Sequence, residues 1–120
     1  MLAGFVFAAL LAAPQLDFAQ AKALADRNEA NLGRLELSQL LDAQRHALDE
    51  AVKACANPSA ELSRFTVVLS LNPDGSTAGS WLKGQTTFAK CVRERLADTG
   101  LAGHWPTPFY TSFELSFDGD

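Results

Sequence analysis

The sequence contains few of the residues from which catalytic and metal sites are usually built. Its 120 residues include only two cysteines, two histidines and one tyrosine. It has no Cys-x-x-Cys pair, no Gly-x-Ser-x-Gly motif and no glycine-rich phosphate loop. The spacing of His46, Cys55, Cys91 and His104 matches no zinc pattern. We therefore expect no catalytic residue, no metal site and no cofactor, and keep a small hydrolase only as a third hypothesis.

An excess of positive charge is also missing. Lysine and arginine total 10 against 14 acidic residues, which gives a formal net charge of -4. A chain with more acidic than basic residues has few positive charges to neutralise phosphates, so we expect no nucleic-acid partner. Because 48% of the residues are hydrophobic and 20% are charged, the chain can bury a core, and its length fits one domain.

No hydrophobic run is long enough to cross a bilayer, although the N-terminus is apolar. Residues 1–13 carry no charged side chain, and as a helix they would span about 20 Å of a hydrocarbon core of about 30 Å. Pro14 ends that run, and Ala19-Gln20-Ala21 is a small-x-small cleavage pattern. We predict a signal peptide over residues 1–21, a mature periplasmic chain over 22–120 and no stable membrane anchor. The alternative is an N-terminal apolar helix that stays and packs.

The pattern from Lys22 to Ala56 is helical, and Gly33 permits two helices, near 22–32 and 35–55. The expected apolar stripe of this segment consists of Leu37, Leu41, Leu48, Val52 and Cys55. Residues 22–54 form an N-terminal extension whose role the sequence does not indicate.

The period then changes to two, which is typical of strands. A hairpin is predicted from three consecutive features: alternating apolar and polar residues over 64–71, the turn Asn72-Pro73-Asp74-Gly75, and a return strand over 76–83. A helix is expected over 88–98 and a last strand over 110–118. The predicted fold is α+β, in the order α-β-β-α-β. It is a two-layer sandwich whose three-stranded antiparallel sheet is covered on one face by two helices.

Cys55 and Cys91 each fall on the apolar stripe of a predicted helix. Since both stripes should face the same sheet, the thiols can meet, and an exported chain with two cysteines favours a disulfide. Two buried free thiols are the alternative if the chain is never exported, and a redox pair is a third.

The segment 55–118 resembles the TonB C-terminal-like domains, in particular their AgmX-type branch. The matching features are Cys55, the turn Asn72–Gly75, Phe88-Ala89-Lys90-Cys91-Val92, Trp105-Pro106-Thr107-Pro108 and the end strand Phe113–Phe117. The resemblance implies a periplasmic, non-enzymatic domain that binds other proteins, often by pairing strands at a sheet edge. Unlike TonB itself, the chain has no proline-rich spacer, so the expectation is a free module.

Two surfaces are candidates for partner binding. The first is the polar return strand Ser76, Thr77, Ala78, Gly79 and Ser80, whose edge could accept a strand or could simply be a weak hairpin arm. The second is the aromatic loop with His104, Trp105, Phe109 and Tyr110, although Trp105 could instead close the core. The leading hypothesis is a secreted protein-binding module. The alternative is a periplasmic inhibitor or immunity protein that neutralises a toxin or cell-wall hydrolase.

Overall fold

The computed structural model describes residues 16–106 and 108–117. The predicted apolar leader 1–13 therefore lies outside the described residues, as do Thr107 and residues 118–120. In the part that is described, no helix has the length and apolar character needed to cross a membrane.

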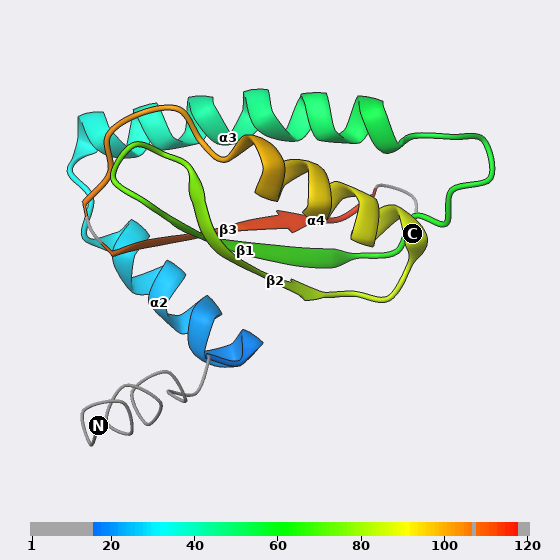
Figure 1. The fold of residues 1–120 in the computed structure, drawn as a ribbon, viewed down its shortest axis with the longest axis horizontal. Helices are drawn as coiled ribbons and strands as arrows, with labels where there is room; N and C mark the ends of the chain where they lie inside the picture. The colour runs from blue at the N-terminus through cyan, green and yellow to red at the C-terminus, as the bar shows by residue number, and fades with distance from the viewer. Residues whose placement is uncertain (1–15, 107, 118–120) are drawn as a thin grey trace, which may run out of the picture.

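The described residues form three helices and three strands, in the order α-α-β-β-α-β (Figure 1). They are α2 (Phe18–Ala30), α3 (Arg34–Cys55), β1 (Phe65–Leu71), β2 (Thr77–Lys83), α4 (Thr87–Thr99) and β3 (Phe109–Leu115). The strands form one antiparallel sheet in the order β2-β1-β3, so β1 is central. The α+β class, the hairpin and the later helix are confirmed.

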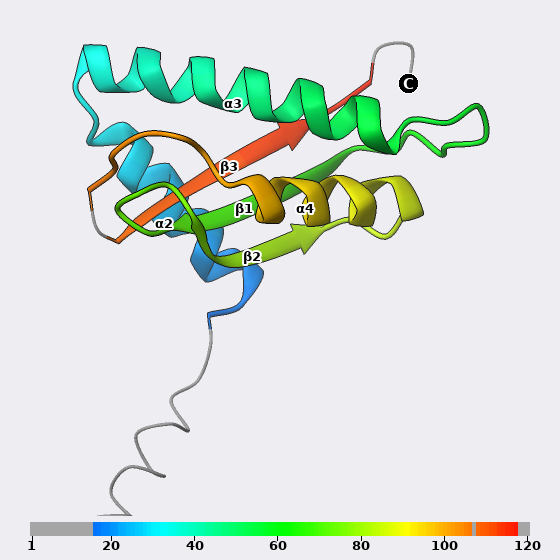
Figure 2. The ribbon, with the colours of Figure 1, turned by 45° about the horizontal axis from the view of Figure 1, so that its top comes forward.

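One face of the sheet carries the main core. Alternate residues of the central strand, Phe65, Val67, Leu69 and Leu71, point to this face and are at most 3% exposed. Helices α3 and α4 cover it together (Figure 2). From α4 the side chains of Phe88, Ala89, Val92 and Leu96 complete the apolar layer. This is the half of the fold that the sequence pattern predicted.

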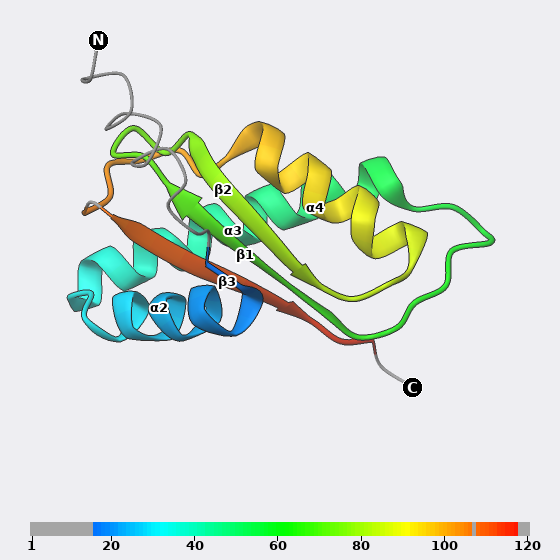
Figure 3. The same ribbon diagram turned by 60° about the horizontal axis from the view of Figure 1, so that its bottom comes forward.

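The opposite face is not open, and the prediction of a two-layer sandwich is wrong in this respect. Helix α2 lies across it, mainly against β3 (Figure 3). Ala21 and Ala25 of α2 are fully buried against Val68, with Trp81 and Tyr110 packed around them. Alanine allows this close approach because its side chain is only a methyl group. The result is a sheet with a helical layer on each side.

The buried side of α3 also differs from the expected stripe. Leu40, Ala51 and Cys55 are the buried residues, whereas Leu37 and Leu41 are 38% and 52% exposed. The buried line continues through Gln44 and Ala47, at helical spacing. Of the expected stripe, Cys55 is buried and Leu48 and Val52 pack half-buried against the core, so the prediction is wrong only for Leu37 and Leu41.

The disulfide predicted between Cys55 and Cys91 is present, with 5.8 Å between the Cα atoms. It joins the last residue of α3 to the second turn of α4. The two helices that share the main core are thus linked covalently at one end.

The turn between β1 and β2 is fastened to the loop that follows α4. The N–H of Leu101 donates to the carbonyl of Gly75 at 2.9 Å, and the N–H of Trp105 donates to the carbonyl of Pro73 at 3.2 Å. Gly75 has φ +93°, a left-handed conformation that favours glycine. The backbone N–H of Ser76, with its hydroxyl, donates to Asp74 and holds the pKa of that exposed carboxyl below its usual value.

Candidate binding edge of the sheet

The sheet has two edges, and the edge of β3 is capped by side chains from the helices. The N–H of Tyr110 donates to Oδ1 of Asn28 at 2.7 Å, and the N–H of Ser112 donates to Oε2 of Glu29 at 2.9 Å. Nε2 of Gln44 donates to the carbonyl of Ser112 at 3.0 Å. These groups satisfy the backbone positions that a further strand would otherwise pair with.

A buried hydroxyl connects these caps. Thr111 is fully buried, donates to Oε2 of Glu29 at 2.5 Å and accepts from Nε2 of Gln44 at 2.8 Å. Glu29 lies in the last turn of α2 and Gln44 lies in α3, so one side chain of β3 is hydrogen-bonded to helices of both layers. No sequence pattern indicates this network, because its three members are 15 to 82 residues apart.

An ion pair extends the closure along the same edge. Nζ of Lys22 lies 2.9 Å from Oε2 of Glu114 and 2.5 Å from Oδ1 of Asp26. The hydrogen bond that Lys22 donates to Asp26 raises the pKa of Lys22, and Glu114 adds to this against the opposing effect of burial. Helix α2 therefore meets β3 through a run of polar contacts as well as through its alanines.

The alternation of an antiparallel ladder identifies the residues that face outward from β2. Because Tyr110 and Ser112 bond outward from β3, the residues of β1 that bond to β3 are Phe65, Val67, Leu69 and Leu71. The intervening residues of β1 bond to β2, where their register partners are Gly79, Trp81 and Lys83. The N–H and C=O groups of Ser80 and Leu82 consequently point away from the sheet. Among the described residues, no helix side chain bonds to them.

The predicted edge residues Ser76–Ser80 do not all share this position. Ser76 belongs to the turn, where its carbonyl accepts from the N–H of Asn72 at 2.8 Å. A bulge at Ala78 shifts the register of β2, which then pairs regularly from Gly79 onward. Of the five residues, Ser80 is the one whose backbone the ladder turns outward. Leu82, which the sequence reasoning missed, is its counterpart.

The aromatic residues predicted to form one contact loop lie on different sides of the sheet. Trp105 is 7% exposed, stacks on the buried ring of Phe109 at 5.5 Å between centroids, and donates from its indole N–H to the carbonyl of Leu101 at 3.1 Å. Tyr110 is half-buried on the other face, 5.7 Å from the ring of Trp81. Only His104 of this set is exposed. In this arrangement Trp105 closes one end of the main core.

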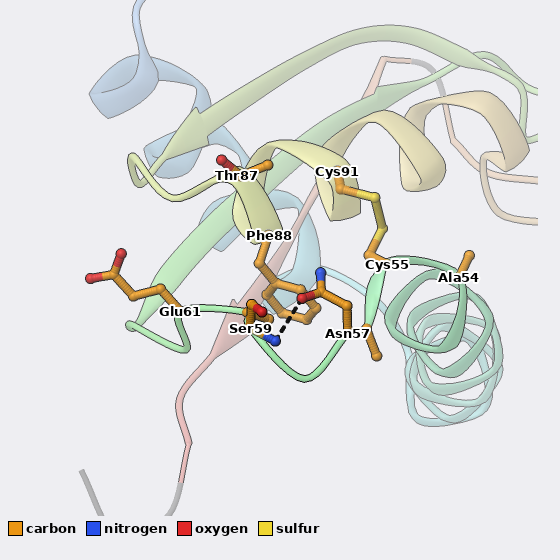
Figure 4. A pocket seen from close by; sticks show the side chains of 10 residues that line it. Ala54, Cys55, Asn57, Ser59, Glu61, Thr87, Phe88 and Cys91 are labelled. Carbon is orange, nitrogen blue, oxygen red and sulfur yellow. Dashed lines mark hydrogen bonds between the residues drawn. A yellow bond between two sulfur atoms is a disulfide. The ribbon is translucent and has the colours of Figure 1, made fainter.

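A pocket of about 430 Å³ adjoins the disulfide (Figure 4). It lies between the end of α3, the loop that follows it and the start of α4. Small side chains, Phe88 and the two cysteines line it, and Glu61 supplies its one carboxylate. In residues 16–106 and 108–117, moreover, no three His, Cys, Asp or Glu side chains gather as a metal site would require. The pocket therefore has few side chains that could act as catalytic groups or metal ligands.

Comparisons of the chain with protein-family models, curated proteins and solved structures find no match. The proposed function therefore rests on the two edges of the sheet.

Proposed function

We propose that the chain is an exported, non-enzymatic module that binds another protein by adding an extended segment of that partner to the edge of β2. The observation that supports this is the difference between the two edges. Asn28, Glu29 and Gln44 bond to three outward groups of β3, the N–H of Tyr110 and the N–H and C=O of Ser112, whereas the outward groups of Ser80 and Leu82 have no such caps among the described residues. An unpaired edge is a template for a further strand.

The residues around β2 favour pairing with a specific partner strand over non-specific aggregation. Trp81, Leu82 and Gly79 are half-buried, so an added strand would find apolar surface on both faces of the sheet. The exposed Lys83 at the end of β2 is a charge of the kind that limits unselective edge-to-edge aggregation. A partner would gain main-chain hydrogen bonds from Ser80 and Leu82 and side-chain contacts beside Trp81.

Export is supported by the disulfide, because such bonds persist in oxidising compartments. The apolar segment 1–13 supports it as well, as does the resemblance of segment 55–118 to the TonB C-terminal-like domains. We place the module in the periplasm on these grounds.

Affinity capture from periplasmic extract tests the proposal with a matched pair of variants. Ser80→Pro deletes the outward N–H and leaves the ladder bonds of Gly79 and Trp81 in place. Ser80→Ala keeps the N–H and is the control. We expect a partner captured by the native chain to be retained by Ser80→Ala and lost with Ser80→Pro. Equal capture by all three folded proteins would contradict the proposal.

A further inference from the structure

The segment that contains the open edge is the most basic part of an acidic chain. Residues 75–97 contain Lys83, Lys90, Arg93 and Arg95 against a single acid, Glu94, although the whole chain has a net charge of -4. The ion pairs found among the described residues involve Lys22 and Arg45, and none involves these four side chains. Their charges are therefore available to a partner.

The geometry of α4 places two of these charges beside β2. Cys91 faces α3, because its sulfur is bonded to Cys55. At 100° per residue, Arg93 lies about 200° from Cys91, and Lys90 lies about 100° from it in the opposite sense. Arg93 is therefore on the side of α4 away from α3, which is the side of β2 (Figure 2), and Lys90 lies next to it toward solvent, about 200° from the buried Val92 that faces the sheet. Lys90 is exposed and Arg93 half-buried.

Lys83 adds a third charge at the same end of the edge. It is the last residue of β2, is exposed, and shares with Trp81 the face that α2 covers. Since three residues separate β2 from α4, the start of α4 lies close to the end of β2. An added strand at Ser80 and Leu82 would thus have Lys83 on one face and, on the other, Arg93 with Lys90 on the solvent side of it.

We infer that the segment accepted by β2 is an acidic extended peptide, with carboxylates that pair with Lys83, Lys90 and Arg93. This inference rests on the proposed function and adds the chemistry of the partner. The main-chain bonds at Ser80 and Leu82 would supply sequence-independent affinity, whereas the basic flank would select Asp and Glu and set the position of the strand. The peptide positions opposite Trp81 and Leu82, which lie on opposite faces of the sheet, would be apolar.

A random peptide library displayed on phage tests this against three forms of the full chain. The first is native, and the second carries Lys83→Glu, Lys90→Glu and Arg93→Glu. The third is a control that carries the same number of reversals on distant exposed residues, Arg27→Glu, Arg34→Glu and Lys53→Glu. We expect the native chain and the control to select acidic peptides that also carry apolar residues, and the edge-reversed chain to select basic ones.

The affinities of one selected peptide and of a neutral version, in which each Asp is replaced by Asn and each Glu by Gln, then distinguish failure of the charge inference from failure of the proposed function. The inference predicts that reversal at the edge, or neutralisation of the peptide, weakens binding about tenfold at low salt. A neutral peptide that binds equally well, yet is lost with Ser80→Pro, would overturn the charge inference and leave the edge intact. Selected peptides that are indifferent to Ser80→Pro, or no selected peptide at all, would contradict the proposed function too. Preferential binding of an anionic oligonucleotide or lipid vesicle would also overturn the inference.

Discussion

Replacing Glu29 by alanine tests whether helix side chains hold the edge of β3. The carboxylate accepts from the hydroxyl of Thr111 at 2.5 Å and from the N–H of Ser112 at 2.9 Å, and Thr111 is fully buried. A hydrogen bond to a charged group contributes about 1.5–3 kcal/mol, but the site is only partly buried and water can replace part of it. We expect Glu29→Ala to lower the free energy of unfolding by about 2–3 kcal/mol.

Urea unfolding followed by tryptophan fluorescence measures this loss, and Glu36→Ala is the matched control. Glu36 also accepts a hydrogen bond from a backbone N–H, that of Gly33 at 3.0 Å, but at an exposed helix start. We expect its removal to cost about 0.5–1 kcal/mol. If Glu29→Ala costs no more than Glu36→Ala, the capping of β3 does not contribute as argued. Glu29→Ala should also self-associate more readily, because it exposes a second edge.

Three further predictions concern the fold. Reduction of Cys55–Cys91, which are 36 residues apart, should lower the free energy of unfolding by about 4 kcal/mol in the chain-entropy model, and an unchanged urea midpoint would contradict this. Gly75→Ala should cost at least about 2 kcal/mol, since a Cβ there would overlap the carbonyl of Leu101 and φ is positive. Gly33→Ala, where a Cβ would meet only Oε1 of Glu36 at an ordinary contact distance of 3.5 Å, is the control, and an equal loss would refute the reasoning. A chain that starts at Lys22 should be about 3 kcal/mol less stable than one that starts at Leu16. It lacks the N-cap Asp17, the packed side chain of Phe18 and the carbonyl of Leu16, which accepts from the indole N–H of Trp81. Equal melting temperatures of the two chains would show that residues 16–21 are dispensable.

The elements with strong periodicity could be predicted from the sequence. Alternation around Val67 and Leu69 indicated a central strand, and Cys55 and Cys91 fell on helix faces that meet. Helix α2 could not be placed in this way. It contacts the sheet through Ala21 and Ala25 and through polar groups, and so it carries no apolar stripe that points to a second face. The predicted cleavage point after Ala21 falls inside this helix.

The candidate site was predictable only in outline. Small polar residues indicated a weak return strand, but the bulge at Ala78 decides which backbone groups face outward, and it depends on pairing with β1. That β3 is the closed edge depends on Glu29 and Gln44, which reach it from two different helices. Trp105 could be assigned only to two alternatives, a contact loop or the end of the core, because an aromatic residue in a proline-rich loop is compatible with both; in the structure it is buried.

Amide hydrogen exchange of the native chain, with and without an acidic peptide selected as above, tests the central claim most directly. The difference between the edges predicts slow exchange at Tyr110 and Ser112, which donate to side chains, and fast exchange at Ser80 and Leu82. Addition of the peptide should slow exchange at Ser80 and Leu82 and leave Tyr110 and Ser112 unchanged. Slow exchange at Ser80 and Leu82 in the free chain, or new protection confined to β3, would contradict the account.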